Sequence, residues 1–458
     1  MIHQYQINGT YVVLDVFSGS VHVVDEVAYD MIGMYETSTK EEIISALMHK
    51  YGSRPDVTEQ ELWDCLADIE ELKQQGKLFT QDAFEPIAKN YRNNQTSLKA
   101  LCLHVAHVCN LNCSYCFAGQ GTYQGTCGLM SLETGKKALD FLVAHSGSHI
   151  NLDVDFFGGE PLMNWEVVKA LVAYGRELEK TSGKVFRFTL TTNGMQLNDE
   201  VTDFCNREMH NVVLSLDGRQ KVHDRFRKDY QNKGSYDTVV PKFQRFVSKR
   251  GKKSYYIRGT YTHFNTDFLQ DILHMVDLGF HELSMEPVVC SPSDPCALTE
   301  QDLSILKQQY EALAKEMVQR NKMGQGFTFY HYIISLTGGP CIYKRVAGCG
   351  SGTEYLAVTP EGELYPCHQF VGTPEFCMGN LEEGITNPAL RDQFAGCNIY
   401  TRPDCTDCWA KLYCAGGCAA NAYHATGSIN GTYQYGCELF RKRIECALWV
   451  KIAEQLED

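Results

Sequence analysis

The chain has 458 residues, more than one hydrophobic core usually supports, so about two or three domains are expected. With 44% apolar and 21% charged residues it has the composition of an ordinary globular protein, and no apolar run approaches the ~20 residues that cross a bilayer. The net charge of −14 disfavours a nucleic-acid partner, because a surface that follows phosphates is basic. No basic leader precedes an apolar run at the N-terminus, so we expect a cytoplasmic protein.

Cysteine is the informative residue, with 20 copies in the chain. Because cytoplasmic thiols are kept reduced, this number favours metal or cluster ligation over a disulfide framework. Some cysteines lie in apolar or helical contexts and are expected to pack as small hydrophobic side chains: Cys65, Cys102, Cys205, Cys290 and Cys446.

Residues 1–90 are predicted to form a small α/β module. Two β-rich runs, 11–16 and 21–24, are separated by a turn and form a hairpin. Helical patterns follow at 26–34, 40–50 and 59–75, and the last two begin with capping boxes, at Thr39 and Thr58. A polar linker is expected over residues 89–97.

Residues 99–325 alternate strand-like runs with amphipathic helices. The strand candidates are 99–108, 151–157, 184–192, 211–216, 254–262 and 282–289, and helices such as 132–144, 165–180 and 267–278 lie between them. Serial strand–helix units predict an α/β fold with a parallel sheet, here a partial (β/α)6 TIM-type barrel. In such folds the chemistry is carried at the carboxyl ends of the strands.

The third region, 341–458, is dense in glycine and cysteine and has short helical patterns. A region with so many loops usually depends on bound metal to fold.

The first chemical motif is CX3CX2C, formed by Cys109, Cys113 and Cys116 directly after the first predicted strand. Three thiolates at this spacing can hold three irons of a [4Fe–4S] cubane and leave the fourth iron open. The alternatives are a zinc site or buried thiols. A structural zinc takes four ligands, usually as two CX2C pairs, whereas this motif offers three.

This motif, with Tyr115 before its last cysteine, resembles that of the radical S-adenosylmethionine (SAM) superfamily, and the resemblance covers residues 99–325. It implies that SAM chelates the open iron and is cleaved there. The stretch Gly158-Gly159-Glu160-Pro161 matches the family's GGEP motif, which holds the SAM amino group. Glycines permit close backbone approach, and a carboxylate pairs with an ammonium. Alone, the stretch could be only a tight turn.

Polar residues at later strand ends also match the family. The resemblance implies that Asn193 and Ser215 contact the ribose and the methionyl carboxylate, with Asp217 as a further candidate. Arg227 ends an HDxxR stretch and is a candidate for the SAM carboxylate. The alternatives are turn chemistry for the Asn-Gly and Asp-Gly pairs and a surface salt bridge for Arg227.

Seven cysteines near the C-terminus resemble the signature of the SPASM domain, which binds two auxiliary [4Fe–4S] clusters. The resemblance implies one set for each cluster: Cys349, Cys367 and Cys418; and Cys405, Cys408, Cys414 and Cys437. The first set has three members. Either Cys341 supplies a fourth ligand or one iron stays open to a substrate thiolate, and we prefer the open iron. Zinc on the second set is the alternative.

The N-terminal module resembles the PqqD-like recognition elements of peptide-modifying enzymes, which have a winged-helix-like fold and add a leader peptide as a strand at a sheet edge. A winged-helix DNA reader is disfavoured, because Lys73 is the only basic residue of 59–75.

With the run Tyr365-Pro366-Cys367-His368-Gln369-Phe370, the three regions together resemble maturases of SCIFF peptides, precursors with six cysteines in about forty-five residues. The resemblance implies a cytoplasmic enzyme with three [4Fe–4S] clusters that uses SAM and a reduced flavodoxin- or ferredoxin-type donor. It forms a thioether between a cysteine sulfur and a carbon of an acceptor residue, commonly threonine, in a Cys-rich ribosomal peptide. The alternatives are sulfatase-maturase-like oxidation or dehydrogenation, and a non-enzymatic electron-transfer or zinc-stapled peptide-binding protein.

Overall fold

The computed structural model describes residues 1–88, 97–123, 125, 127–291, 293–336 and 342–455. Its N-terminal part is an antiparallel sheet in the order β1-β2-β3, followed by helices. The predicted hairpin and helices are present, and β1 adds a strand that the sequence analysis did not anticipate: β1 (Ile2–Ile7), β2 (Thr10–Asp15), β3 (Val21–Val24), α1 (Glu26–Met34), α2 (Lys40–Tyr51), α3 (Glu59–Gln74) and α4 (Glu85–Ala88). The predicted linker lies, except for Ser97, outside the described residues.

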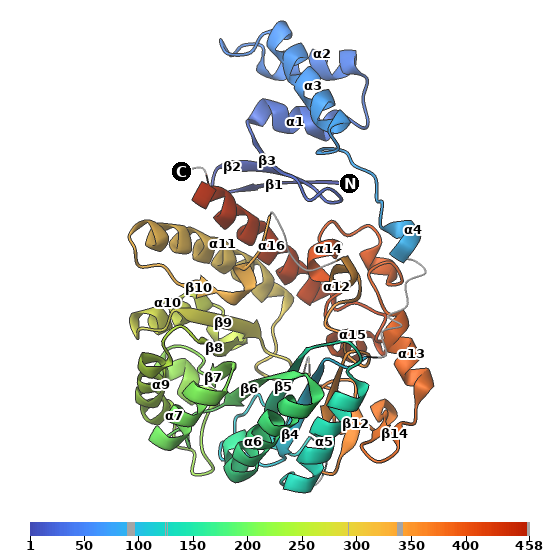
Figure 1. Ribbon diagram of the computed structural model, residues 1–458. Coiled ribbons are helices and arrows are strands. Elements are labelled where there is room, and N and C mark those ends of the chain that lie inside the picture. The colour runs from blue at the N-terminus through green and yellow to red at the C-terminus, as the bar shows by residue number, and fades with distance from the viewer. Residues whose placement is uncertain (89–96, 124, 126, 292, 337–341, 456–458) are drawn as a thin grey trace.

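The six predicted parallel strands form the centre of a second, larger sheet (Figure 1). They are β4 (Ala100–Ala106), β5 (Asn151–Gly158), β6 (Val185–Thr192), β7 (Asn211–Ser215), β8 (Ser254–Tyr261) and β9 (Glu282–Pro287), and the short β10 (Thr328–Phe329) pairs with β9. Helices in the connections cover the outside of this sheet: α5 (Leu132–His145), α6 (Trp165–Ser182), α7 (Asp199–Glu208), α8 (Gln220–Phe226), α9 (Tyr236–Arg250), α10 (Phe268–Asp277) and α11 (Glu300–Lys322). The result is the partial barrel that the sequence predicts.

The C-terminal region prolongs this sheet instead of standing apart from it. β11 (Tyr355–Val358) pairs in parallel with β4, and β12 (Glu363–Tyr365), β13 (Gly379–Asn380) and β14 (Gly384–Ile385) continue in antiparallel pairs. This pairing satisfies backbone groups that β4 would otherwise expose as an edge strand. The remaining helices are α12 (Ile342–Ala347), α13 (Pro388–Gly396), α14 (Lys411–Cys414), α15 (Ala419–Thr426) and α16 (Gln434–Gln455).

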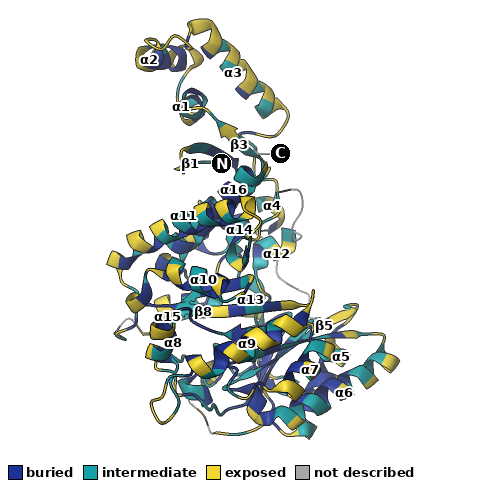
Figure 2. Ribbon diagram, turned by 90° about the vertical axis from the view of Figure 1, so that its left-hand side faces the viewer, coloured by how far each residue is buried: buried dark blue, intermediate teal, exposed yellow. Residues whose placement is uncertain are grey.

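The last helix, α16, lies between the N-terminal sheet and the barrel (Figure 1). The Tyr5 hydroxyl donates a hydrogen bond to the backbone oxygen of Glu445 (3.2 Å), and the Trp449 indole N–H donates to the Thr10 hydroxyl (3.1 Å). The N-terminal sheet is therefore docked on α16, while α2 and α3 keep exposed outer faces (Figure 2). Although 22 residues long, α16 is not apolar enough to cross a membrane, and neither is any other described helix.

Candidate active site

A cavity of about 390 Å³ opens at the carboxyl ends of the barrel strands. Its walls include every residue predicted from the resemblance to bind the first cluster or SAM, Asp217 apart: Cys109, Cys113, Tyr115, Cys116, Gly158, Gly159, Glu160, Pro161, Asn193, Ser215 and Arg227. These residues come from five separate chain segments, each just after a strand or on the helix that follows. The fold thus brings together what the motifs predict separately.

The three cysteines of the first motif lie on the loop that follows β4. A turn closes it, in which the Cys116 backbone N–H donates to the Cys113 oxygen (3.2 Å). Burial raises the pKa of Cys109 to about 12 and that of Cys113 to about 11. These thiols are therefore protonated without a metal, and binding of iron would release their protons. Three soft thiol donors in one cavity fit the [4Fe–4S] cluster that the motif predicts.

The two glycines after β5 are required by how closely the chain approaches β4. Gly158 has φ +126°, and a Cβ there would lie 2.2 Å from the Ala106 oxygen. A Cβ on Gly159 would lie 2.2 Å from the Val108 oxygen, directly before Cys109. The Gly159 and Glu160 N–H groups donate to these same two oxygens, at 2.8 and 2.9 Å. The GGEP turn is thus clamped to the start of the cysteine loop.

Gly159→Ala is expected to push the GGEP turn away from the cysteine loop. Overpacking of this kind costs about 1–3 kcal/mol of unfolding free energy. We expect a lower melting temperature, less bound iron and weaker SAM binding, measured by thermal denaturation, iron analysis and equilibrium dialysis. Gly396→Ala is the matched control, because a Cβ there meets no atom within 4 Å. Wild-type iron and SAM binding in Gly159→Ala would contradict the clamp.

The Glu160 carboxylate is buried and bound to its own chain. It accepts hydrogen bonds from the Thr192 hydroxyl (2.7 Å) and from the N–H groups of Asn193 (2.8 Å) and Leu162 (3.1 Å). Burial raises its pKa to about 7, although these three bonds lower it. Glu160 therefore fixes the end of β6 against the GGEP turn, in addition to lining the cavity.

Asn193 connects the end of β6 to the cysteine loop. Its side-chain amide donates to the Asn110 side-chain oxygen at 2.8 Å and to the Cys109 sulfur at 3.6 Å. Its own oxygen accepts the Met195 N–H at 3.0 Å, which is the turn chemistry that the sequence analysis gives as the alternative. Both interpretations of Asn193 are compatible with its position.

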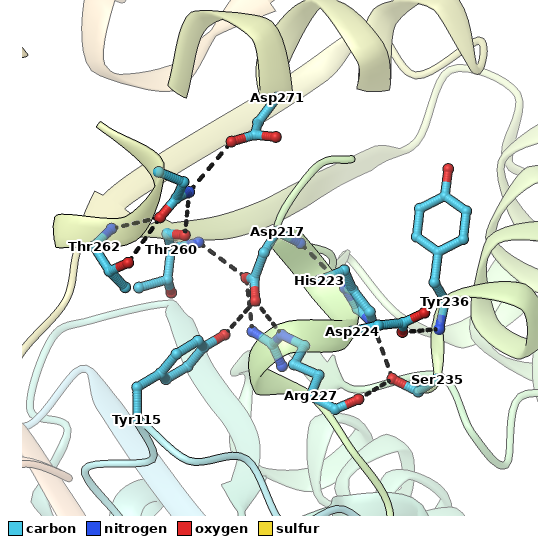
Figure 3. A network of polar contacts seen from close by, with 11 residues as sticks. Tyr115, Asp217, His223, Asp224, Arg227, Ser235, Tyr236, Thr260, Thr262 and Asp271 are labelled. Carbon is cyan, nitrogen blue, oxygen red and sulfur yellow. Dashed lines mark hydrogen bonds and ion pairs between the residues drawn. The ribbon is translucent and has the colours of Figure 1, made fainter. Parts of the chain in front are cut away.

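Asp217 and Arg227 form a buried ion pair behind the cysteine loop (Figure 3). The Asp217 carboxylate accepts two bonds from the Arg227 guanidinium, at 2.9 and 3.3 Å. It also accepts the Tyr115 hydroxyl (2.5 Å) and the Thr260 N–H (3.0 Å). The alternative of a surface salt bridge for Arg227 is therefore wrong, because its partner is fully buried. Asp217 positions Arg227 and Tyr115 at the cavity wall.

The cavity wall also contains Arg258, Glu286 and His368, whose presence there the sequence did not predict. Arg258 on β8 is exposed, and its charge acts on Glu286 and on His331. Glu286 on β9 lies 3.4 Å from Arg443. Burial, and then the nearby Arg258, lower the pKa of His368 to about 4, so this imidazole is neutral. Arg258 and Glu286 stand alone on their strands, without a motif, whereas His368 lies in the motif with Cys367.

Within each predicted C-terminal set, neighbouring thiols affect one another's pKa. Burial raises the pKa of Cys367 to about 12, with smaller contributions from Cys418 and Cys349. The pKa of Cys414 is likewise raised to about 12 by burial and by the neighbouring thiols of the second set, Cys405, Cys408 and Cys437. Cys341, the alternative fourth ligand, lies outside the described residues.

A zinc ion is the alternative to an iron–sulfur cluster for the second set. A tetrahedral zinc with Zn–S bonds of about 2.3 Å would hold its sulfurs about 3.8 Å apart. In the described part of the chain no three of these sulfurs lie within 4.8 Å of one another. Their spacing therefore does not favour a single zinc ion.

Cys418 belongs to the walls of two cavities. It lines the main cavity together with Gln369 and Asn421. It also lines a neighbouring cavity of about 250 Å³, which contains Cys414 and Cys437 of the second set. Cys418 therefore lies between the main cavity and two thiols of the second set, Cys414 and Cys437.

Comparisons with known proteins agree with this geometry. Residues 103–278 match the model of the Radical SAM superfamily. The cysteine-type anaerobic sulfatase-maturating enzyme of Clostridium novyi is 25% identical over 374 residues, which are 76% of this chain and 95% of that protein. The solved structure of anSMEcpe with bound AdoMet and Kp18Cys peptide covers 78% of this chain and 99% of its own, with 19% identity and a TM-score of 0.65. Streptococcus suis SuiB bound to precursor peptide SuiA covers 94% and 97%, with 16% identity and a TM-score of 0.53.

The chain therefore contains a radical SAM domain, and it shares its fold with anSMEcpe and SuiB. The superfamily of this domain implies SAM and a [4Fe–4S] cluster, whose ligands in this chain are predicted to be Cys109, Cys113 and Cys116.

Proposed function

We propose that this chain is a peptide maturase that joins a cysteine sulfur to a carbon of an acceptor residue, commonly threonine, in a Cys-rich ribosomal precursor. The observation that carries the proposal is the shared cavity: the residues predicted to bind SAM and the first cluster lie in the same cavity as Cys418 of the first auxiliary set. The relatives support a peptide substrate, because SuiB is solved with its precursor peptide and anSMEcpe with a peptide.

When bound, a reduced cluster and SAM supply one-electron cleavage of SAM and, through it, removal of a hydrogen atom from the acceptor residue. The chain itself positions SAM and encloses it in the cavity. Asp217 holds Arg227 at the cavity wall, where its guanidinium can pair with the SAM carboxylate. Glu160 and the two glycines hold the SAM amino-group site against the cysteine loop. Such fixed positioning is what the protein adds to chemistry carried by the cofactor.

We assign two auxiliary [4Fe–4S] clusters to the two C-terminal cysteine sets. The first set offers three described thiols, so an iron on it without a fourth protein ligand would bind and deprotonate the substrate cysteine. Cys414 and Cys437 of the second set line a cavity next to Cys418, so a cluster on that set would pass an electron outward to a flavodoxin- or ferredoxin-type protein. The precursor loses two hydrogens overall, and the sulfur and the acceptor carbon gain one bond.

The N-terminal sheet is proposed to bind the leader of the precursor. Among the described strands β3 pairs only with β2, so its other side is an open edge. An extended peptide can add to such an edge as a further strand. Val23 on β3 is 43% exposed, in keeping with a surface open to a partner.

Proline substitution on β3 tests leader binding. Successive N–H groups of an edge strand point alternately to the neighbouring strand and to the open side. Of the two variants His22→Pro and Val23→Pro, one therefore removes an N–H on the open side and leaves the hydrogen bonds between β2 and β3 intact. We expect that variant to keep the wild-type melting temperature and lose leader binding by about tenfold or more, since strand addition depends on main-chain bonds. Fluorescence anisotropy with a labelled leader measures this, and Val23→Ala is the control. Unchanged affinity in both proline variants would contradict strand addition.

The decisive experiment is mass spectrometry of a Cys-rich precursor, encoded beside this gene, after anaerobic incubation with enzyme, SAM and reductant. The expected product is lighter by two hydrogens, and one cysteine resists alkylation after disulfide reduction. An unchanged peptide with released 5′-deoxyadenosine would reject this substrate or this chemistry.

A sulfatase-maturase-like oxidation or dehydrogenation is the competing assignment, supported by the C. novyi relative. Dehydrogenation would give the same loss of mass but leave every cysteine open to alkylation. An electron-transfer or peptide-binding protein would release no 5′-deoxyadenosine.

A further inference from the structure

The loop between β9 and α11 carries three side chains that could bind a metal ion and that the proposed function does not use. The thiols of Cys290 and Cys296 and the carboxylate of Asp294 lie within 4.8 Å of one another. Among the described residues this is the only such group of three. From the sequence, Cys290 is expected to pack as a small hydrophobic side chain and Cys296 has no predicted role, so the fold reveals this pairing.

The distances match a tetrahedral thiolate site. The two sulfurs are 3.8 Å apart, which is the separation that Zn–S bonds of about 2.3 Å impose in a tetrahedron. A disulfide would require the sulfurs to approach to about 2.05 Å, and it would leave the adjacent carboxylate without a role. Two thiols and one carboxylate are a donor set that selects zinc among the common divalent ions.

The surrounding backbone holds the ligands in place. Asp294 accepts the Cys296 N–H at 2.9 Å, and the Asp294 N–H donates to the Ser291 oxygen at 2.9 Å. The Cys296 oxygen accepts the N–H of His263, from the loop after β8, at 3.1 Å. Cys290 and Asp294 are half-buried, and Cys296 is buried. The ligands are thus fixed on one side and open to solvent on the other.

We propose that Cys290, Asp294 and Cys296 bind one Zn²⁺ ion in an open site, in which solvent completes three protein ligands, unlike a structural zinc with four protein ligands. The site is separate from the predicted cluster ligands. The two cysteines pack in an apolar cluster with Tyr115, Phe226 and Val288. Val288 and Val289 line the main cavity, so the ion would hold this part of the cavity wall in place.

Metal analysis of the anaerobically reconstituted enzyme, equilibrated with one equivalent of Zn²⁺ and desalted, tests the proposal. We expect about one zinc per chain in the wild type and in the control Cys65→Ser, whose thiol lies on α3. In Cys290→Ser/Cys296→Ser we expect at least about a tenfold loss of zinc with unchanged iron and sulfide. Co²⁺ in place of Zn²⁺ should give tetrahedral thiolate absorption bands that disappear in the double variant.

Asp294→Asn keeps both thiols and is the second variant should the double variant fold poorly. It is expected to weaken zinc binding by about tenfold or more. Three results would overturn the proposal: no zinc in the wild type, equal zinc in all variants, or a wild-type loop peptide two hydrogens lighter, which would mark a disulfide. Because zinc content is the quantity measured, the result tests the zinc site independently of whether the enzyme forms a thioether.

Discussion

Cys113→Ala is expected to abolish SAM cleavage, with 5′-deoxyadenosine formation falling by at least about a thousandfold, as when one member of a catalytic unit is removed. Cys113 is one of the three thiols that line the SAM side of the cavity, and two thiols cannot hold a cubane of the three-cysteine type. Chromatographic assay of 5′-deoxyadenosine with excess reductant measures the effect. Iron analysis should show a loss of about four irons per chain.

Cys65→Ser is the control for this substitution, because Cys65 lies on α3, outside the barrel. It should leave both the iron content and SAM cleavage at wild-type values. Undiminished cleavage in Cys113→Ala, with Cys116→Ala behaving in the same way, would remove the basis for assigning the first cluster to this loop.

Asp217→Asn is expected to destabilise the fold and the cysteine loop together. The substitution leaves the buried Arg227 guanidinium without its counter-charge, and breaking a buried pair in this way costs about 3–5 kcal/mol. It also weakens the bond from the Tyr115 hydroxyl, which ties the loop between Cys113 and Cys116 to β7. We therefore expect a lower melting temperature and reduced iron content, measured on the same preparations.

Asp271→Asn separates the two effects. Asp271 is also fully buried and paired with an arginine, Arg219. It is linked to Asp217 through Asn265 and Thr260, and it makes no hydrogen bond to a described residue of the cysteine loop (Figure 3). It should lower the melting temperature while the iron content stays at the wild-type value. Equal loss of iron in both variants would show that general destabilisation, and not the Tyr115 contact, controls cluster binding.

The elements of the barrel could be predicted because their patterns are strong. In β5 and β6 buried apolar residues alternate with less buried positions, which is the period-two pattern of a strand, and the two predicted runs end within one residue of the observed strands. β1 was missed because Ile2–Ile7 includes the polar residues His3, Gln4 and Gln6. β11 to β14 have two to four residues each, too few for a periodic signal, so their joining of the barrel sheet was not predicted.

Some residues of the candidate site could also be predicted from the sequence, and others could not. Residues within contiguous motifs, such as the GGEP stretch, could be assigned from spacing alone. Arg258 and Glu286 enter the cavity from separate strands, and only the parallel register of β8 and β9 places them there. The close approach of Cys290 and Cys296 depends on a loop conformation that no local pattern encodes.

Because the N-terminal sheet is docked on α16, this helix sets the distance between that sheet and the second cysteine set. Trp449, which contacts Thr10 of β2, and Cys437 of the second cysteine set lie on the same helix, 12 residues apart. That separation is about 18 Å along the axis, which a fully extended peptide covers with at least about five residues. If the leader binds the N-terminal sheet as proposed, we expect a spacer of about this length or more between it and a peptide segment that lies beside the second set. In that arrangement α16 would set the shortest separation between the leader and a cysteine that is modified.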